Sequence, residues 1–214
     1  MSKTTKTLAA LWVVLLLIPA GDAVAQRRRG LVDVSPSSER RGAWLSLGLG
    51  AGSETYRYTN QPGGYADYVT APSFWLAAGG TVSPSFRLGG EINGWVNEYD
   101  DLATGFHTTE SLVSGLLTGQ LYPARRLGLF LKGGLGISRS GTSVEGDQVG
   151  ETGFAWLGGA GWDIKLGRRV FLSPALSVLN HRSNPGQRNP ADDLGALHER
   201  VITVGVALTF QLGR

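Results

Sequence analysis

The last stretch of the chain, residues 199–212, places the tightest constraint on the fold. From position 202 every second residue is large and apolar, and the residues between are small or polar: Ile202, Val204, Val206, Leu208, Phe210 and Leu212 against Thr203, Gly205, Ala207, Thr209 and Gln211. This alternation is typical of a β-strand with two unlike faces. A strand needs about 9–11 residues to cross a bilayer, roughly twice the usual strand length in soluble proteins. The stretch therefore predicts a strand that crosses a membrane.

The first 25 residues predict export. Lys3 and Lys6 precede an apolar run at residues 8–18, and a small-x-small cleavage site follows at residues 23–25. The run is shorter than the ~20 apolar residues that a spanning helix needs. We therefore expect residues 1–25 to be a secretory signal peptide, and we expect membrane insertion to use strands.

Composition narrows the class of protein further. The chain has 214 residues and no cysteine, which suits one exported domain without disulfides. The formal net charge of +3 comes from the first 42 residues, since acidic and basic residues nearly balance from position 43 onward. The chain therefore lacks the basic face that nucleic-acid binding requires. Residues 26–42 are rich in Arg, Ser and Pro with little apolar surface, so we expect a disordered periplasmic tail.

The alternating pattern recurs along the rest of the chain. Together with the last stretch it predicts eight long strands, at residues 43–56, 70–82, 86–97, 108–122, 128–140, 152–166, 170–180 and 199–212. Short turns at 83–85, 123–127 and 167–169 alternate with longer polar connections at 57–69, 98–107, 141–151 and 181–198. An even strand number, short periplasmic turns and long outer loops are typical of outer-membrane barrels. Residues 43–214 are therefore predicted to form an all-β fold, an eight-stranded antiparallel up-and-down transmembrane β-barrel.

The two faces of the predicted strands differ in chemistry. Large apolar residues occupy one face, whereas the other holds mainly Gly, Ser, Ala and Thr with a few charges of both signs: Arg87, Glu91, Lys132, Asp163 and Lys165. An eight-stranded barrel has an interior just wide enough for side chains. We expect these five residues to form a lumen charge network of paired groups in a filled, non-conducting interior. A soluble lipocalin-like binding barrel, which would place the apolar face inside and the polar face outside, is the alternative.

Aromatic residues near the predicted strand ends suggest interfacial girdles. One group lies at the predicted periplasmic ends and the other at the outer ends: Phe86, Tyr122 and Phe210 against Tyr56, Tyr58, Trp95, Tyr99 and Phe154.

Three segments resemble the small OmpA-like outer-membrane β-barrel family. They are R-L-G-L-F-L-K-G-G-L-G-I at residues 126–137, G-G-A-G-W-D-I-K-L-G-R-R at residues 158–169, and the closing strand. The resemblance implies a monomeric integral protein of the Gram-negative outer membrane, in contact with lipid and lipopolysaccharide, with a structural or surface-interaction role. It also implies insertion by the barrel assembly machinery, which reads a terminal aromatic residue; here Phe210 lies four residues before the end.

A second, local resemblance concerns catalysis. The run N-H-R-S-N-P-G at residues 180–186 is similar to the His-x-Ser-Asn run of the PagL-like lipid A deacylases. The resemblance implies a lipid A ester hydrolase with Ser183 as nucleophile and His181 as its base. The acid that orients the imidazole would be Asp192, Asp193 or Glu199, because the family's glutamate position falls near a glycine in this chain.

Strand parity favours a structural role over this enzyme. His181 and Ser183 share the parity of Ser177, which is the lumen side, whereas an enzyme that cuts an acyl chain needs these groups toward lipid. No catalytic residue is therefore favoured, and the hydrolase remains an alternative. The three histidines lack metal-ligand spacing, and no glycine run leads into a predicted helix as a phosphate-binding loop would. We predict neither a metal nor a cofactor.

Overall fold

The computed structural model describes residues 40–100, 105–124, 127–144, 147–183 and 194–212. The chain divides into two compact units, residues 1–31 and 32–214, and every described residue belongs to the second. The predicted signal peptide and residues 26–39 of the predicted tail lie outside the described residues. No helix in the described ranges is long and apolar enough to span a membrane.

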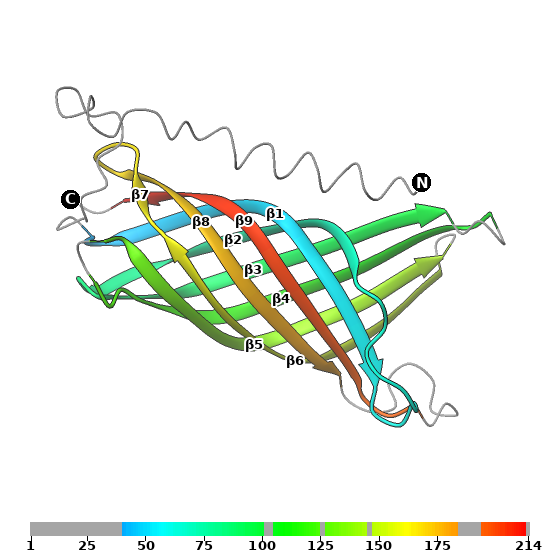
Figure 1. The fold of residues 1–214 in the computed structure, drawn as a ribbon. Coiled ribbons are helices and arrows are strands. Elements are labelled where there is room, and N and C mark those ends of the chain that lie inside the picture. The colour runs from blue at the N-terminus through cyan, green and yellow to red at the C-terminus, as the bar shows by residue number, and fades with distance from the viewer. Residues whose placement is uncertain (1–39, 101–104, 125–126, 145–146, 184–193, 213–214) are drawn as a thin grey trace. The chain divides into compact units, whose positions relative to one another are not determined.

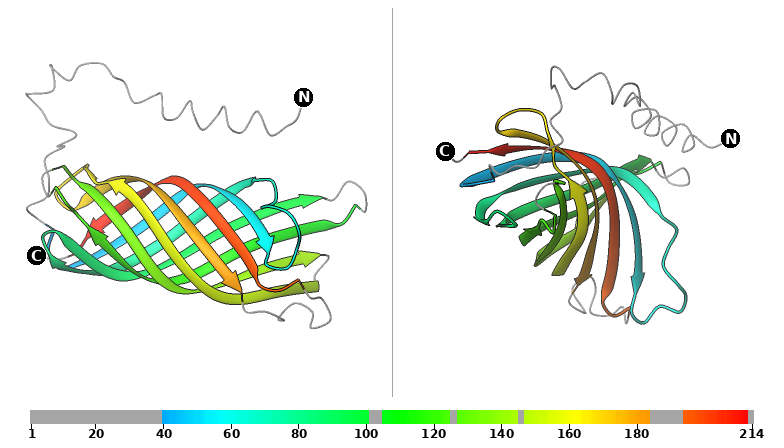
Figure 2. Two further views of the ribbon diagram at one scale, coloured as in Figure 1. Left: turned by 60° about the horizontal axis from the view of Figure 1, so that its bottom comes forward. Right: turned by 60° about the vertical axis from the view of Figure 1, so that its left-hand side comes forward.

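The described residues form eight long strands and one short one (Figure 1). Their bounds are β1 Ala43–Tyr58, β2 Val69–Ser83, β3 Phe86–Asp100, β4 His107–Leu121, β5 Leu129–Val144, β6 Asp147–Trp162, β7 Ile164–Lys165, β8 Val170–Ser183 and β9 Leu197–Gln211. Strand β7 follows β6 after a break at Asp163. Each long strand pairs antiparallel with its neighbours, β1 pairs with β9, and β6 pairs with β8. The sheet is therefore a closed eight-stranded up-and-down barrel (Figure 2), which confirms the predicted fold class.

The two ends of the barrel differ in their connections. At one end, which we call the turn end, residues 84–85, 122–128 and 166–169 link the strands. At the other, the loop end, residues 59–68, 101–106 and 184–196 separate β1 from β2, β3 from β4, and β8 from β9. Strand β1 begins and β9 ends at the turn end. The sequence predicted four long connections at the loop end, and the one between β5 and β6 differs, because residues 145–146 alone separate these strands.

The outer surface of the barrel is apolar and its inner surface is mostly polar. Leu49, Leu117 and Ile137 point outward with 71%, 64% and 68% of their surface exposed, whereas Arg87 and Glu91 point inward and are 1% and 2% exposed. A soluble barrel would reverse these faces, because water rather than lipid would surround it. The lipocalin-like alternative is therefore wrong.

Several strands extend beyond the predicted limits. The predicted loop at 141–151 is largely strand, because β5 ends at Val144 and β6 begins at Asp147, and β8 continues to Ser183. Polar residues in these extensions still pair backbone to backbone, as Ser143 does with Gln148. A change from apolar to polar residues marks the edge of the lipid-facing belt, and the strand ladder continues past it.

Five aromatic residues assigned to the girdles face the interior instead: Trp95 and Tyr122 are buried there, and Tyr56, Tyr58 and Tyr99 line a pocket at its mouth. Trp95 is 4% exposed and donates its indole N–H to the Gly52 carbonyl oxygen at 2.9 Å. Tyr122 is 1% exposed and donates its hydroxyl to Asp163 Oδ2 at 2.9 Å. Both residues have the strand parity of the polar face, so parity rather than closeness to a strand end decides their direction.

Interior glycines make room for the large inward side chains. A Cβ atom on Gly48 would lie 2.0 Å from the indole ring of Trp75, which crosses over this position from the neighbouring strand. Large and small residues therefore alternate across the lumen, as a narrow barrel requires.

Candidate functional site

Asp163 is the centre of a buried polar cluster near the turn end. It lies between β6 and β7 and has the inward parity of β6, and its carboxylate lies 3.5 Å from Nη1 of Arg87 and 3.6 Å from Nε of Arg40. Its Oδ1 also accepts a hydrogen bond of 2.8 Å from the Ser173 hydroxyl. Arg87 in turn donates to the Tyr122 hydroxyl and to Gln211 Oε1, both at 2.8 Å. One carboxylate therefore balances two guanidinium groups in the described part of this cluster.

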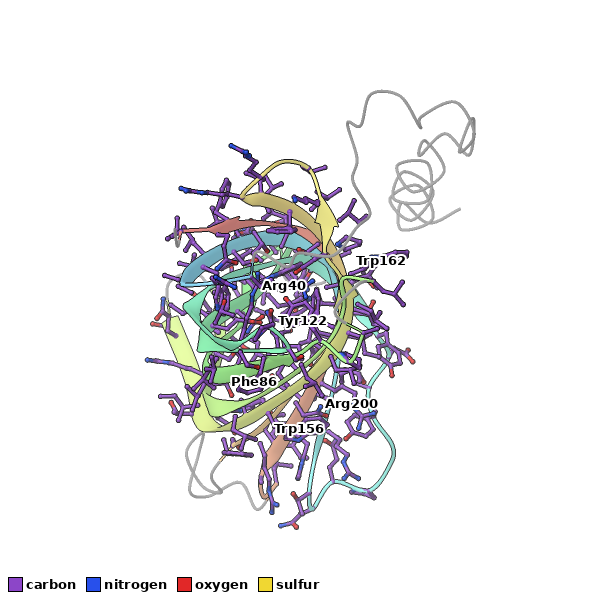
Figure 3. The ribbon with its side chains drawn as sticks, turned by 90° about the vertical axis from the view of Figure 1, so that its left-hand side faces the viewer. Arg40, Phe86, Tyr122, Trp156, Trp162 and Arg200 are labelled. Carbon is purple, nitrogen blue, oxygen red and sulfur yellow. The ribbon has the colours of Figure 1, made fainter. Side chains whose placement is uncertain are left out.

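Arg40 contributes to the cluster although the sequence assigned it to the disordered tail. It is 2% exposed, and its guanidinium lies 3.6 Å from the centroid of the Tyr122 ring (Figure 3). Burial lowers the pKa of Arg40, while Tyr122 and Asp163 oppose this change and Arg87 adds to it. Arginine stays charged even so. Its position just before β1 carries no periodic signal that could have placed it in the lumen.

A second ion pair lies further along the lumen. Lys132 Nζ on β5 donates to Glu91 Oε1 on β3 at 2.7 Å, and both side chains are buried. The void beside this pair, also lined by Trp75 and Phe130, measures about 20 Å³. This is room for about one water molecule.

The five predicted lumen charges therefore divide into two buried groups and one residue near the rim. Arg87 lies with Asp163, and Glu91 lies with Lys132. Lys165 is half-buried in β7, opposite Phe171.

An apolar layer fills the lumen beyond the second ion pair. It consists of buried side chains from six of the eight long strands that close the barrel: Ala71, Trp95, Leu112, Leu116, Ala155, Leu157, Leu179 and Val201. The strands that contribute none are β1 and β5. The sequence predicted a polar lumen, so this layer was missed, although each member has the parity of the inward face.

The predicted catalytic residues His181 and Ser183 both point into the lumen. They are 2% and 3% exposed, so neither can reach an acyl chain in the surrounding lipid. The Ser183 hydroxyl accepts the backbone N–H of Leu197 at 2.9 Å, and His181 Nδ1 lies 2.5 Å from the Ser138 hydroxyl. Asp192 and Asp193 lie outside the described residues. The described geometry gives no support to a lipid A hydrolase, and Ser183, which fell in the predicted connection 181–198, is the last residue of β8.

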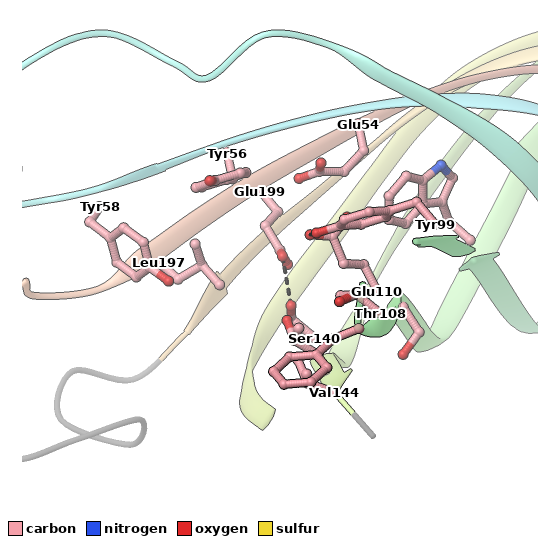
Figure 4. A pocket seen from close by; sticks show the side chains of 15 residues that line it. Glu54, Tyr56, Tyr58, Tyr99, Thr108, Glu110, Ser140, Val144, Leu197 and Glu199 are labelled. Atoms are coloured by element: carbon pink, nitrogen blue, oxygen red, sulfur yellow. Dashed lines mark hydrogen bonds between the residues drawn. The ribbon is translucent and has the colours of Figure 1, made fainter. Parts of the chain in front are cut away.

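A larger pocket opens at the loop end, beyond the apolar layer (Figure 4). Its volume is about 440 Å³. Three glutamates from β1, β4 and β9 line it together with five aromatic residues: Glu54, Glu110 and Glu199 with Tyr56, Tyr58, Trp95, Tyr99 and Phe106. We call this site the mouth pocket. The sequence analysis named Glu199 only as a possible catalytic acid, and it did not single out Glu54 or Glu110.

The glutamates of the mouth pocket differ in their partners. Glu110 accepts hydrogen bonds from Asn97 at 3.1 Å and Tyr99 at 3.4 Å. Glu199 accepts one from Ser140 at 2.6 Å. Glu54 is 6% exposed, and its buried Oε1 accepts no hydrogen bond from any described residue.

The sequence matches no protein-family model and no curated protein. Comparison with solved structures gives small outer-membrane barrels. Ail, the attachment invasion locus protein of Yersinia pestis, in complex with the heparin analogue sucrose octasulfate, is 11% identical with a TM-score of 0.53, and the match covers 79% of this chain and 99% of Ail. Neisserial surface protein A is 11% identical over 78% of this chain and 97% of its own, with a TM-score of 0.48. OprG from Pseudomonas aeruginosa is 14% identical over 80% and 97%, with a TM-score of 0.45.

These likenesses concern the fold alone. They do not show the resemblance to lipid A deacylases. The fold and the apolar outer surface together support the outer-membrane location that the sequence predicts. The chain has the fold of a small outer-membrane β-barrel such as Ail.

Proposed function

We propose that this protein is a non-conducting outer-membrane barrel with a structural or surface-interaction role. The turn end and middle of the lumen serve as a plug, and the loop end carries the interaction site. In this arrangement the barrel anchors the site in the membrane and holds its side chains in place.

The filling of the lumen is the observation that carries the first part of this proposal. Three successive layers occupy it: the cluster around Asp163, the pair of Lys132 with Glu91, and the apolar layer. The void beside Lys132 measures about 20 Å³, whereas the mouth pocket measures about 440 Å³. An ion that enters from the loop end would have to cross an apolar layer without its hydration shell, which is costly.

The mouth pocket supports the second part. It combines an open rim with a fixed floor, since Tyr56, Tyr99 and Phe106 are more than 40% exposed whereas Trp95 is 4% exposed. Outer-membrane barrels direct their longer loops away from the cell. The pocket would therefore face the surroundings of the cell.

Planar-bilayer recording tests the plug. Purified protein that has been folded in detergent is added to a bilayer, and a large general porin in the same apparatus serves as the positive control, because barrels of about 16–18 strands enclose an aqueous channel. We expect no large, stable current steps from this protein. Reproducible steps that scale with protein concentration would refute a non-conducting lumen.

A further inference from the structure

We propose that the mouth pocket binds a small organic ammonium compound, a primary amine with an apolar body. This inference rests on the proposed surface-interaction role and names a ligand class for it. It is carried by an unpartnered buried carboxylate oxygen, the charge of the lining, and the aromatic residues around it.

Glu54 provides the first part of the argument. Its side chain projects from β1 into the mouth pocket, and its Oε1 is buried without a hydrogen-bond donor among the described residues. A buried carboxylate oxygen without a donor destabilises a protein. A ligand in the pocket that carries an N–H group and a positive charge would place a hydrogen-bond donor and a counter-charge beside this carboxylate. A primary ammonium group does so with three donors on one nitrogen.

The acidic lining of the pocket indicates that the ligand carries a positive charge. Glu54, Glu110 and Glu199 reach this one pocket from three different strands. No lysine or arginine is among the described residues that line the pocket. His181 Nε2 lies 3.9 Å from Glu199 and is the nearest basic group that the structure places beside these carboxylates. An anionic ligand would be repelled here, and a cation would be attracted.

The aromatic lining and the volume give the kind of cation. Tyrosine, tryptophan and phenylalanine attract a cation through the faces of their rings and also cover apolar groups. The rings of Tyr56 and Tyr58 stand edge to face with centroids 6.2 Å apart, and Trp95 forms the buried floor. A volume of about 440 Å³ is in the range of small-molecule sites. No three acidic or histidine side chains among the described residues are placed to hold one metal ion together. The site therefore suits an amine that carries carbon rather than a bare ion.

Calorimetric titration with phenethylamine tests the proposal. The probe carries a primary ammonium group on an apolar body, and phenethyl alcohol, in which a hydroxyl replaces the ammonium group, is its neutral counterpart. The full chain, folded in a non-ionic detergent, is titrated with each. We expect phenethylamine to bind at least about tenfold more tightly than the alcohol, because a charge-assisted hydrogen bond contributes that much or more. Equal affinity for both compounds, or no heat from phenethylamine at millimolar concentration, would overturn the proposal.

Two matched variants locate the binding. Glu54→Gln keeps the shape of the side chain and removes its charge, and we expect it to weaken phenethylamine binding about tenfold. Glu98→Gln removes a carboxylate on β3 that is exposed at the loop end and is not part of the pocket lining. We expect this control to bind within about twofold of wild type. Equal losses in both variants would mean that general negative charge, and not this pocket, attracts the amine.

A failure of amine binding can be distinguished from a failure of the protein to fold and from a failure of the non-conducting lumen. Gel mobility before and after heating shows whether each variant is folded, and the comparison of amine with alcohol on the wild-type protein needs no variant. Bilayer recording needs no ligand, so a failure of amine binding leaves the non-conducting barrel untouched, and current steps would refute the plug without any bearing on the amine.

Discussion

Replacing Asp163 by asparagine should destabilise the barrel more than any other isosteric change at the turn end. The substitution keeps the volume of the side chain and removes the one carboxylate that faces Arg40 and Arg87, both of which are buried. Removing one member of a buried ion pair costs about 3–5 kcal/mol, because the other charge is left without compensation. Arg87 keeps the Tyr122 hydroxyl and Gln211 Oε1 as acceptors at 2.8 Å. We therefore expect a loss near the lower end, about 3 kcal/mol in the free energy of unfolding.

Urea titration in lipid vesicles, followed by tryptophan fluorescence, measures this loss. Asp147→Asn is the matched control, since Asp147 begins β6, the strand that ends just before Asp163, and is exposed. The control should change the free energy of unfolding by no more than about 0.5 kcal/mol. A double variant that adds Arg87→Met removes one uncompensated charge and should recover part of the loss, with an interaction energy of about 0.5–3 kcal/mol.

Two results would refute this reasoning. If Asp163→Asn unfolds at the same urea concentration as the control, the guanidinium groups do not depend on the carboxylate for their stability. If the double variant loses the full sum of the two single losses, the two side chains act independently and the distance of 3.5 Å between them has no energetic weight.

Three further changes test other parts of the structure. Ser183→Ala should lower the free energy of unfolding by about 1 kcal/mol, since the Leu197 N–H loses its acceptor. Mass spectrometry of lipid A from cells with either form should show no difference. Loss of one acyl chain with the wild type alone would support the hydrolase after all. Leu117→Arg places a charge on the lipid-facing surface and should cost about 2–4 kcal/mol in lipid vesicles, with a cost near zero indicating that this surface is not in lipid. Gly136→Ala should destabilise the barrel by roughly 1–3 kcal/mol, since the added Cβ would lie 2.0 Å from the Gly115 carbonyl oxygen. The control Gly115→Ala adds a Cβ that meets nothing within 4 Å, so its stability should be nearly that of the wild type. Equal unfolding midpoints for the two variants would contradict the close packing at Gly136.

The fold could be predicted because one rule applies to the whole chain. In a strand that lies between lipid and lumen, each residue faces the side opposite to its neighbours, so parity alone separates Leu117 from Glu91. The same rule predicted that His181 points inward. Five aromatic residues were misplaced, because the preference of such residues for the membrane interface was given more weight than parity: Tyr56, Tyr58, Trp95, Tyr99 and Tyr122.

Contacts across the lumen could not be predicted in this way. Glu91 and Lys132 lie on β3 and β5, which are separated by β4, so neither the spacing nor the register of paired strands brings them together. Their contact depends on the diameter of the closed barrel. The place of Arg40 depends on the path of the chain before β1, where periodicity ends. The mouth pocket likewise depends on Glu54, Glu110 and Glu199. Their strands, β1, β4 and β9, are far apart in the sequence and line one pocket only in the closed barrel.

The ladder between β1 and β9 has a consequence for how this protein enters the membrane. It joins the first strand of the barrel to the last, and a hydrogen bond such as that of Ser46 with Thr209 links residues 163 positions apart. Hairpins between consecutive strands can form early, whereas this contact must wait until the last strand exists, because closing so long a loop is entropically unfavourable. Until it forms, β1 and β9 both present unpaired N–H and C=O groups, which hydrocarbon cannot accommodate. Insertion and closure of the ring should therefore occur together, and a chain that lacks its final strand should fail to insert at all rather than insert as an open sheet.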